Sequence, residues 1–297
     1  MNINSFKDNF SYKVQFDHEL AKFTWFGVGG NAEIFFMAED IISLSNILKN
    51  KPKEINVLII GAGSNLLIRD KGFKGIVLLT KKLNKITIDK NHIITAEAGA
   101  IDAEVARFAR NNLRGGLEFL LGIPGTIGGG IRMNSGAFGS EFKDILIDVK
   151  AINHSGVFRT FSNKELGMKY REIEISEEWI FCSARLMTFK DQKINIENKM
   201  KKIIALRKEA QPTGVKTGGS TFKNPIGNKA WKLIDEAGCR GFKIGGAMIS
   251  EKHCNFIINS KKSTAQDIED LGEYVIDKVK KTSGVELSWE IKRIGTK

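Results

Sequence analysis

Cysteine, proline and long apolar runs are scarce in this 297-residue sequence, and each scarcity excludes a class of protein. The three cysteines lie far apart without a C-x-x-C pair, so neither a disulfide framework nor a zinc site of ordinary spacing is supported. No apolar run approaches the roughly 18–20 residues that cross a bilayer, and the first residues lack a basic segment followed by an apolar one. We therefore expect a cytoplasmic protein without a secretory signal, membrane partner or metal, whose cysteines are reduced and buried.

Arginine is also scarce relative to lysine. The 46 basic and 34 acidic residues leave a formal net charge of +12, yet only 11 of the basic residues are arginine. Specific recognition of phosphates and bases favours arginine. The short run of Lys199, Lys201 and Lys202 falls on a predicted helix and is typical of a solvated helix face. The charge therefore favours an anionic small-molecule substrate over a nucleic acid.

Glycine, in contrast, is abundant, with 30 residues against 4 prolines, and the length suggests about two domains. The first two-thirds of the chain alternates short strand patterns with glycine turns. The expected strands are residues 57–60, 76–79, 85–89, 92–96, 145–152, 157–161 and 179–189, with hairpins around Lys90-Asn91 and His154-Ser155-Gly156. Residues 102–110 have helical spacing behind Asp102 as a candidate N-cap. This region is predicted to be α+β, with mixed or antiparallel sheets.

The pattern changes near residue 195, where a compact α/β unit of about 100 residues is expected to begin. Its first helix runs to about Glu209, with Met200, Ile203, Ile204 and Leu206 on one face. A polar, glycine-rich stretch follows. The remaining predicted elements are helices at 229–237 and 264–281 and strands at 242–249, 254–259 and 285–294.

Four glycine clusters are candidates for ligand-binding loops: residues 27–30, 61–65, 122–130 and 218–220. The cluster Gly61-Ala62-Gly63-Ser64-Asn65 directly follows a strand, where a phosphate-binding turn belongs. It is not a dinucleotide fingerprint, because Leu66 stands where the third glycine of G-x-G-x-x-G should be, and no P-loop motif occurs. Several loops that present backbone N–H groups to a large pyrophosphate-containing cofactor would explain the glycine excess.

Six segments of the sequence, collinear from about residue 20 to the C-terminus, closely resemble the UDP-N-acetylenolpyruvoylglucosamine reductase (UDP-N-acetylmuramate dehydrogenase) family. They are residues 23–30, 61–67, 122–129, 133–139, 219–225 and 244–256. The resemblance implies a two-lobed FAD-binding domain similar to vanillyl-alcohol oxidase and p-cresol methylhydroxylase, over residues 1–192 with a lobe boundary near 80–85. A C-terminal α/β substrate-binding domain is expected over residues 193–297. The short chain and its three tyrosines resemble the short subclass, which lacks a tyrosine-bearing loop.

The activity that the resemblance implies is the NADPH-dependent reduction of UDP-N-acetyl-3-O-(1-carboxyvinyl)-glucosamine to UDP-N-acetylmuramate, in peptidoglycan precursor synthesis for cell-wall growth and division. FAD is expected to be bound without a covalent link, because the cysteines and the four histidines lie outside the glycine clusters. A monomer is expected. One alternative is an FAD-dependent oxidase or dehydrogenase of the same fold that acts on another substrate. Another is a non-catalytic basic binding module, which would be colourless when purified.

The resemblance also assigns site residues by position. Those expected to bind FAD are Gly61, Ala62, Gly63, Ser64, Asn65, Gly122, Pro124, Gly125, Thr126 and Gly128. Those expected to be catalytic are Ser220 as proton donor, Arg171 for the substrate carboxylate, and Glu290. Tyr170, Lys223 and Asn224 are expected to bind substrate.

The sequence around two of these residues, Arg171 and Glu290, bears on their assignment. Ile173 stands two places after Arg171, where the family pattern has serine, and this weakens the local match. Glu286 and Glu290 would share one face of a terminal strand, so spacing cannot choose between them. The family pattern, a glutamate just before the last apolar-basic-x-apolar-Gly run, selects Glu290.

Overall fold

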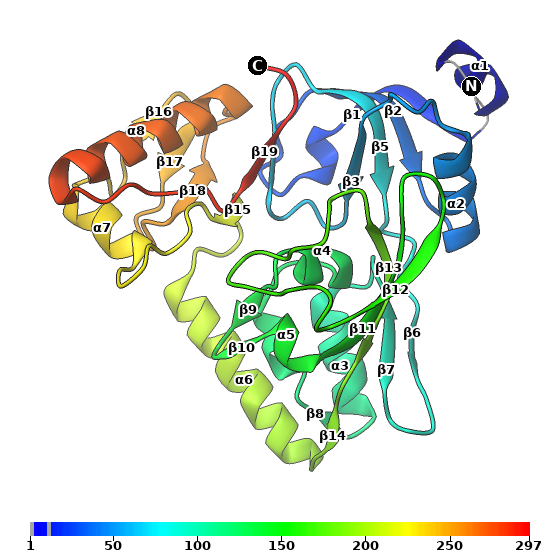
Figure 1. The fold of residues 1–297 in the computed structure, drawn as a ribbon. Coiled ribbons are helices and arrows are strands. Elements are labelled where there is room, and N and C mark those ends of the chain that lie inside the picture. The colour runs from blue at the N-terminus through cyan, green and yellow to red at the C-terminus, as the bar shows by residue number, and fades with distance from the viewer. Residues whose placement is uncertain (1–2, 11–12) are drawn as a thin grey trace. The chain divides into compact units, whose positions relative to one another are not determined.

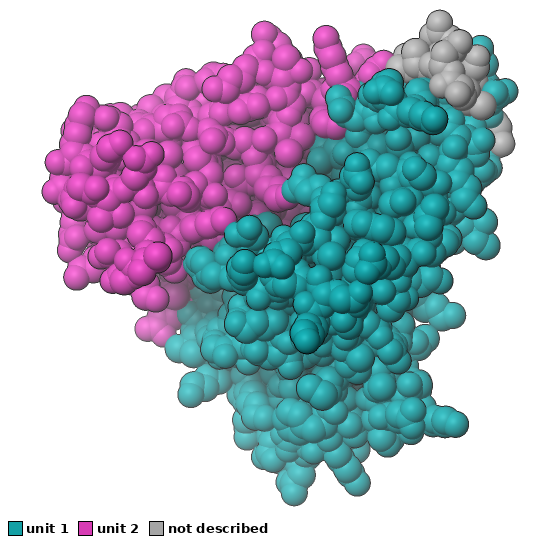
Figure 2. Space-filling view, viewed as in Figure 1, with its two compact units in different colours: residues 1–15, 34–62, 75–207 teal, residues 16–33, 63–74, 208–297 magenta. Residues whose placement is uncertain are grey.

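The computed structural model describes residues 3–10 and 13–297, and the chain divides into two compact units (Figures 1 and 2). Unit 1 comprises residues 1–15, 34–62 and 75–207, and unit 2 comprises residues 16–33, 63–74 and 208–297. Two N-terminal segments therefore belong to the same unit as the C-terminal residues. The boundary predicted at 192/193, between an FAD-binding and a substrate-binding domain, does not coincide with a boundary of these packing units and stays a prediction.

The largest sheet of unit 1 is antiparallel, in the order β12-β11-β13-β7-β6. Its strands are β6 (Ile86–Ile88), β7 (Ile94–Glu97), β11 (Leu146–Ile152), β12 (Phe158–Ser162) and β13 (Ile180–Leu186). Both predicted hairpins, β6–β7 and β11–β12, are confirmed. The single strand predicted over 179–189 is wrong in its last part. It breaks where the Thr188 hydroxyl donates to the carbonyl of His92, and β14 (Phe189–Lys190) then pairs with β8 (Arg114–Gly115).

A second sheet has the order β1-β2-β5-β3. Its strands are β1 (Gln15–Glu19), β2 (Asn31–Met37), β3 (Val57–Ile60) and β5 (Phe73–Leu79). The predicted strands at 57–60 and 76–79 are confirmed, and they run parallel with Val57 opposite Ile76. Helices α1 (Ile3–Phe10) and α2 (Ile41–Asn50) contribute Phe6, Leu44 and Ile47 to the apolar core here.

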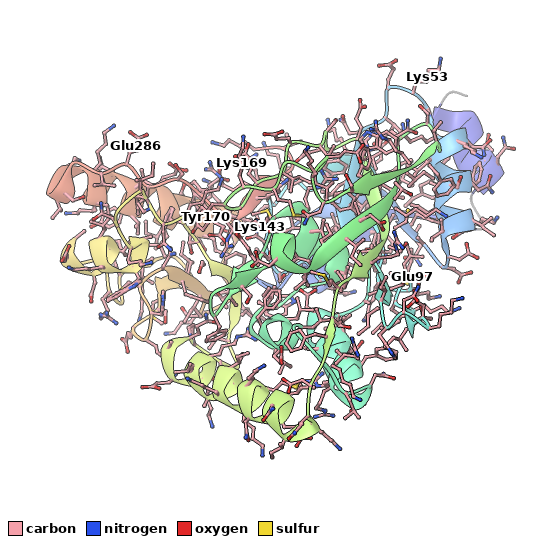
Figure 3. All side chains as sticks on the ribbon, turned by 60° about the horizontal axis from the view of Figure 1, so that its bottom comes forward. Lys53, Glu97, Lys143, Lys169, Tyr170 and Glu286 are labelled. Atoms are coloured by element: carbon pink, nitrogen blue, oxygen red, sulfur yellow. The ribbon has the colours of Figure 1, made fainter. Side chains whose placement is uncertain are left out.

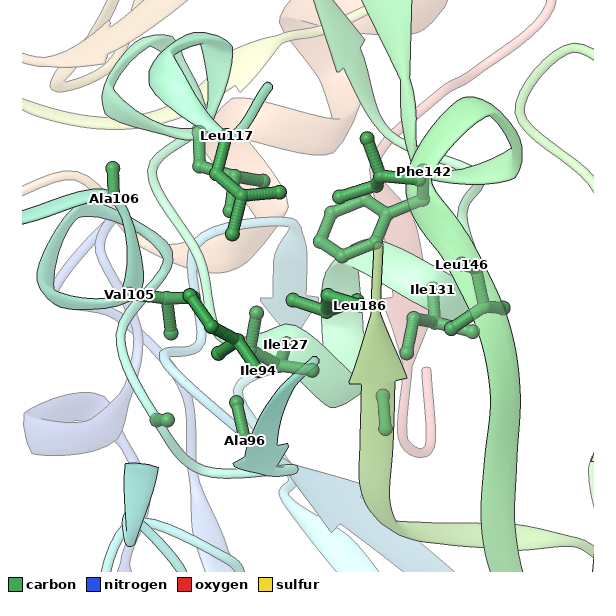
Figure 4. Packing of buried hydrophobic residues seen from close by; sticks show 14 of the residues in the cluster. Ile94, Ala96, Val105, Ala106, Leu117, Ile127, Ile131, Phe142, Leu146 and Leu186 are labelled. Carbon is green, nitrogen blue, oxygen red and sulfur yellow. The ribbon is translucent and has the colours of Figure 1, made fainter. Parts of the chain in front are cut away.

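Helices and short strands enclose the other core of unit 1 (Figure 4). They are α3 (Asp102–Asn111), η2 (Glu118–Gly122), α4 (Ile127–Arg132), β9 (Gly136–Ala137), β10 (Ser140–Glu141), α5 (Phe142–Ile145) and α6 (Lys193–Ala210). In Figure 4, Val105 of α3 packs toward Ile94 of the sheet. The predicted apolar face of α6 is wrong in part. Ile196, Met200 and Ile203 form the buried stripe, because their i, i+4, i+7 spacing keeps them on one side, whereas Ile204 and Leu206 are exposed.

Unit 2 contains an antiparallel sheet of order β15-β18-β17-β16. Its strands are β15 (Lys216–Ser220), β16 (Lys243–Ile244), β17 (Ala247–Ile249) and β18 (Phe256–Asn259), and η1 (Ala21–Phe23) also belongs to this unit. Helices α7 (Ala230–Glu236) and α8 (Ala265–Ser283) share a core with the sheet. Strand β4 (Leu66–Ile68) pairs in parallel with β19 (Lys292–Ile294). The helix predicted over 264–281 is confirmed as α8, and Thr264 is its N-cap.

Two strand predictions in unit 2 are wrong. Residues 242–249 form a hairpin instead of one strand, since Gly245 takes φ +51 and a Cβ atom on Gly246 would lie 2.5 Å from Ser263 N. Of residues 285–294, only β19 is a regular strand. Trp289 instead packs its indole on Gly272 of α8, where a Cβ atom would clash with it. The strand-parity argument for Glu286 and Glu290 therefore does not apply.

Candidate active site

In unit 1, the start of the turn after β3, Gly61-Ala62, lies against the loop between η2 and α4. A Cβ atom on Gly61 would clash with Thr126 Oγ1, so the two segments can approach this closely only because residue 61 is glycine. The loop is fixed by backbone hydrogen bonds, from Ile127 N to Ala100 O (3.0 Å) and from Gly128 N to Ala98 O (2.8 Å). The structure thus brings together two of the segments predicted to bind FAD.

Three buried polar atoms beside this loop have no hydrogen-bond partner among the residues that the structure describes: Thr126 Oγ1 and both carboxyl oxygens of Asp102. Asp102 is not the predicted N-cap, because it is the first residue of α3 and its side chain points into the protein, with Oδ2 2.8 Å from a Cβ position on Gly125. Burial raises the pKa of Asp102 well above its usual value, which favours the neutral form of the carboxyl, the form that can donate a hydrogen bond. A hydroxyl, a neutral acid and loop N–H groups suit the oxygens of FAD. The residues fit this cofactor.

The buried Asp102 makes the stability of the flavin-free protein depend on pH. The folded state holds the Asp102 proton, while the unfolded chain releases it near the usual pKa of about 3.9. This stabilising contribution is therefore complete below about pH 4 and is lost as the pH rises through the raised pKa of the folded state. Asp102→Asn is expected to lose less stability than wild type between pH 4 and 8, measured as urea midpoints. The exposed Glu104→Gln, on the same helix, is the control, and parallel curves for wild type and Asp102→Asn would contradict the expectation.

The second half of the same turn, Gly63-Ser64-Asn65, lies in unit 2. Gly63 has φ +66, and a Cβ atom there would clash with the carbonyl of Phe23, so only glycine fits. Asn65 Nδ2 donates to the carbonyl of Glu290 (3.2 Å), and Asn65 O accepts from Lys292 N (3.1 Å). A residue predicted to bind FAD therefore also holds the segment that carries a predicted catalytic glutamate.

Ser220 and Glu290 lie on adjacent backbone segments of unit 2. Ser220 is half-buried at the end of β15, after Gly219 with φ +80. The carbonyl of the next residue, Thr221, accepts a hydrogen bond from Glu290 N at 2.8 Å. Glu286, in contrast, is exposed and pairs with Lys280 at 2.8 Å, and this pairing lowers the pKa of Glu286 (Figure 3). The structure thus places Glu290, and not Glu286, beside Ser220.

A buried asparagine that sequence reasoning missed holds the loop after Ser220. Asn255 Oδ1 accepts from Phe222 N (2.9 Å), and its Nδ2 donates to Phe222 O (2.8 Å). Its backbone carbonyl also accepts from Thr221 N (2.8 Å). The side chain thus substitutes for a neighbouring strand at a point where β15 has ended. Its place in the segment 244–256, which carries part of the family resemblance, is a sequence signal that could have identified it.

The predicted substrate-binding residues of this loop differ in exposure. Lys223 is half-buried, and its N–H donates to the carbonyl of Ser288 at 2.9 Å. Asn224 is exposed, and its Oδ1 accepts from Ala230 N at 3.0 Å, at the start of α7. Asn224 therefore stabilises the first turn of this helix, and its amide N–H₂ is the part suited to donate to a ligand oxygen.

Tyr170 and Arg171 form the tip of a tight turn in unit 1, and Figure 3 labels Tyr170 beside Lys169. Lys169 and Glu172 exchange both backbone hydrogen bonds, at 2.9 and 3.3 Å, so the two residues between them project from the turn. The Arg171 guanidinium lies 5.0 Å from the centre of the Tyr170 ring. Ile173, where the family pattern has serine, packs against the core of unit 1. Its side chain serves packing at this position.

Other candidate chemistry receives no support from the part of the chain that the structure describes. Cys182, Cys239 and Cys254 are free and buried, as predicted, and burial raises the pKa of Cys182 to about 12 and that of Cys254 to about 11. Within residues 3–10 and 13–297, no group of His, Cys, Asp and Glu could hold a metal ion. Over the same residues, no helix is long and apolar enough to cross a bilayer.

Comparison with known proteins matches both halves of the chain. Residues 32–162 match an FAD binding domain, and residues 211–294 match the C-terminal domain of UDP-N-acetylenolpyruvoylglucosamine reductase. The UDP-N-acetylenolpyruvoylglucosamine reductase of Paramagnetospirillum magneticum is 49% identical over 284 residues, which are 95% of this chain and 92% of that protein. The protein of the same name from Rickettsia prowazekii is 50% identical over 280 residues, 94% of this chain and 95% of its own.

Solved structures agree with these matches. The crystal structure of UDP-N-acetylenolpyruvylglucosamine reductase from Thermus caldophilus matches with a TM-score of 0.82 at 31% identity, over 95% of this chain and 98% of that one. A berberine bridge enzyme structure matches 64% of this chain and 43% of its own with a TM-score of 0.50 at 13% identity, which is a likeness of fold alone. The predicted fold class, an FAD-binding domain joined to a C-terminal substrate domain, is confirmed.

Proposed function

Because this chain belongs to the UDP-N-acetylenolpyruvoylglucosamine reductase family, we propose that its candidate site residues supply the proton, the positive charge and the substrate contacts of that reaction. The enzyme is an FAD-containing, NADPH-dependent oxidoreductase that reduces UDP-N-acetyl-3-O-(1-carboxyvinyl)-glucosamine to UDP-N-acetylmuramate for peptidoglycan synthesis. An oxidase or dehydrogenase acting on another substrate does not account for the reductase-specific match over residues 211–294. A non-catalytic binding module does not account for the FAD binding domain.

The reaction makes two demands on the protein. The chemistry that FAD supplies when bound is the transfer of hydride from NADPH to the enolpyruvyl group. Addition of hydride to the methylene carbon leaves negative charge on the neighbouring carbon, delocalised into the carboxylate. The protein must therefore provide a positive charge at the carboxylate and a proton donor at that carbon.

Ser220 is the proposed proton donor. Its hydroxyl is a weak acid in water, but it has to deliver only one proton to a strongly basic carbon. The observation that carries the proposal is the hydrogen bond between Glu290 N and Thr221 O, which puts the Glu290 residue beside the Ser220 backbone. A carboxyl at this place would stabilise the intermediate at the carbon that receives the proton. Asn65 donates a hydrogen bond to the backbone carbonyl of Glu290 and would thereby fix the position of the Glu290 side chain.

Arg171 is the proposed partner of the substrate carboxylate, with Tyr170 beside it. A guanidinium can donate two parallel hydrogen bonds to a carboxylate and stabilise the enolate that replaces it. Arg171 has φ +58, in the left-handed region that non-glycine residues rarely adopt, and such strain is frequent at functional sites. Arg171 lies at the tip of a turn and not within a strand of the sheet.

Lys223 and Asn224 are proposed to bind the diphosphate and orient the sugar. A half-buried lysine attracts phosphate oxygens as a point charge, and the Asn224 amide adds a neutral donor. Three further predictions belong to this proposal. The enzyme is of the short subclass, it is a monomer, and residues 1–192 bind FAD while residues 193–297 bind substrate. The residues that would bind FAD all lie within residues 1–192: Gly61, Ala62, Gly63, Ser64, Asn65, Gly122, Pro124, Gly125, Thr126 and Gly128.

A two-step experiment tests the proposed function. The purified protein is expected to be yellow, and acid precipitation should release all of the flavin, because the buried cysteines and the histidines lie outside the glycine loops. Under anaerobic conditions NADPH should bleach the flavin, and the enolpyruvyl UDP-sugar should restore its absorbance.

Each step has an outcome that contradicts the proposal. Flavin that stays with the acid pellet would mean a covalent link. Reduced enzyme that regains its colour with oxygen but not with the enolpyruvyl UDP-sugar would mean an oxidase of the same fold.

A further inference from the structure

The turn that carries Arg171 belongs to a segment without regular structure between β12 and β13. Within this segment, residues 167–179, backbone hydrogen bonds join Lys169 with Glu172 and Trp179 N with Ser176 O, and Glu174 N donates to Leu166 O just before it. Arg171 is held at φ +58, which costs free energy for a residue with a Cβ atom. The direction in which Arg171 projects therefore depends on contacts that the segment makes with the rest of unit 1.

Two side chains at the end of α4 make such contacts. Arg132, the last residue of α4, donates to the carbonyls of Ile175 (3.1 Å), Ser176 (3.3 Å) and Trp179. Its guanidinium also stacks over the ring of Phe181 at 4.3 Å. Arg132 thus fixes the end of the segment that enters β13.

Asn134 contacts the other end, directly beside the turn. Its side chain is fully buried, and Nδ2 donates to the carbonyl of Lys169 (3.0 Å) and to Glu141 Oε2 (2.9 Å). Its Oδ1 accepts from Lys143 N (2.9 Å). Both N–H bonds of the amide and its oxygen are therefore used. Asn134 also has φ +38, a conformation that asparagine tolerates better than most residues.

The Lys169 carbonyl is the atom group of the turn that Asn134 contacts. The same oxygen accepts the bond from Glu172 N that closes the turn, so its two lone pairs have one partner inside the turn and one outside it. We propose that Asn134 is a positioning residue: its amide fixes the Lys169 carbonyl and thereby directs Arg171 toward the substrate carboxylate. This inference rests on the role proposed above for Arg171.

The chemistry of the site makes a specific substitution informative. Asn134→Asp keeps the shape and the bond from Lys143 N but turns a donor into an acceptor that faces the Lys169 carbonyl. The charged groups around it are Glu141, which pairs with Lys143, and Lys169, which pairs with Glu174 at 2.7 Å. Burial and the neighbouring Glu141 carboxylate should raise the pKa of the introduced carboxyl. Once protonated, it can donate one hydrogen bond again.

The test compares the two half-reactions of Asn134→Asp, Asn134→Gly and Arg171→Ala in the FAD-loaded enzyme by stopped-flow absorbance. Reduction by NADPH should stay within twofold of wild type. Reoxidation by the enolpyruvyl UDP-sugar should slow by about 10–10²-fold, since a displacement near 1 Å can cost about 10²-fold. Relative to wild type, Asn134→Asp should recover as the pH falls, whereas Asn134→Gly should not. The double variant Asn134→Gly/Arg171→Ala should be no slower than Arg171→Ala alone.

A matched control separates positioning from loss of stability. Val149→Ala makes a cavity in the core at β11, outside the proposed site, and should lower the melting temperature without slowing reoxidation. Asn134→Asp, which keeps the shape of the side chain, carries the test if Asn134→Gly does not retain FAD. Equal slowing of both half-reactions, or additive effects in the double variant, would overturn the positioning role. Normal reoxidation by Arg171→Ala would instead refute the proposed function on which it rests.

Discussion

Replacing Ser220 by alanine should lower turnover by about 10²–10⁴-fold, the range that general acid catalysis typically contributes. FAD content and reduction by NADPH should stay at wild-type levels, because the change removes one oxygen atom at the end of β15 and leaves the backbone pairing opposite Phe256 intact. The measurement is NADPH oxidation in the presence of the enolpyruvyl UDP-sugar. In heavy water, wild-type product should carry deuterium at the lactyl carbon that bears the carboxylate.

Two further variants test whether the loss of activity comes from the missing proton donor. Ser220→Cys should recover part of the activity, because a thiol is similar in size and more acidic than the hydroxyl. Ser288→Ala removes an exposed hydroxyl in the same unit while keeping the carbonyl that accepts from Lys223 N, so it should behave as wild type. A loss in Ser288→Ala as large as that in Ser220→Ala would show that the assay reports the fold of this region.

Replacing Arg171 by alanine should slow the reoxidation half-reaction by about 10²–10³-fold, the loss typical when one preorganised charge contact to a transition state is removed. Reduction of the flavin by NADPH should change little. Lysine should restore little, because an ammonium group cannot present the planar pair of donors. The two rates are measured separately by stopped-flow absorbance.

The strained backbone at Arg171 calls for its own control. Glycine is the residue best suited to φ +58, so Arg171→Gly should relieve strain and yet lose as much reoxidation rate as Arg171→Ala. Recovery of the rate in Arg171→Gly would show that Arg171→Ala had failed through its backbone. Equal loss in both half-reactions would indicate a structural role for Arg171.

Much of the fold could be predicted because local patterns specify it. The hairpins β6–β7 and β11–β12 follow from alternating apolar residues around polar turns, and α8 corresponds to the helix predicted over 264–281. The glycine clusters indicated where loops approach other backbone, and Gly61 and Gly63 are indeed required by close contacts. The hairpins and the helix depend on neighbours in sequence, so a single sequence reveals them. The partners of Gly61 and Gly63 are Thr126 and Phe23 on distant segments, and the sequence shows only the glycines.

The failures have a common physical cause, which is contact between distant segments. Residues 285–291 have a strand-like pattern, but Trp289 packs on Gly272 and the segment bonds to the loop after β15. Asp102 reads as a helix cap, yet its carboxyl is buried against a loop more than twenty residues later in the chain. Arg69 pairs with Glu269, at 2.8 Å, across 200 residues of sequence. No local pattern specifies such pairs.

The rate at which prereduced Ser220→Ala is reoxidised by the enolpyruvyl UDP-sugar tests the central assignment most directly. The enzyme is first reduced with one equivalent of NADPH without oxygen, and the return of flavin absorbance is then followed after mixing with substrate. This isolates the step in which the proposed acid acts from every earlier one. The account predicts a rate lower than wild type by about 10²–10⁴-fold. Reoxidation as fast as wild type would show that Ser220 is not the proton donor.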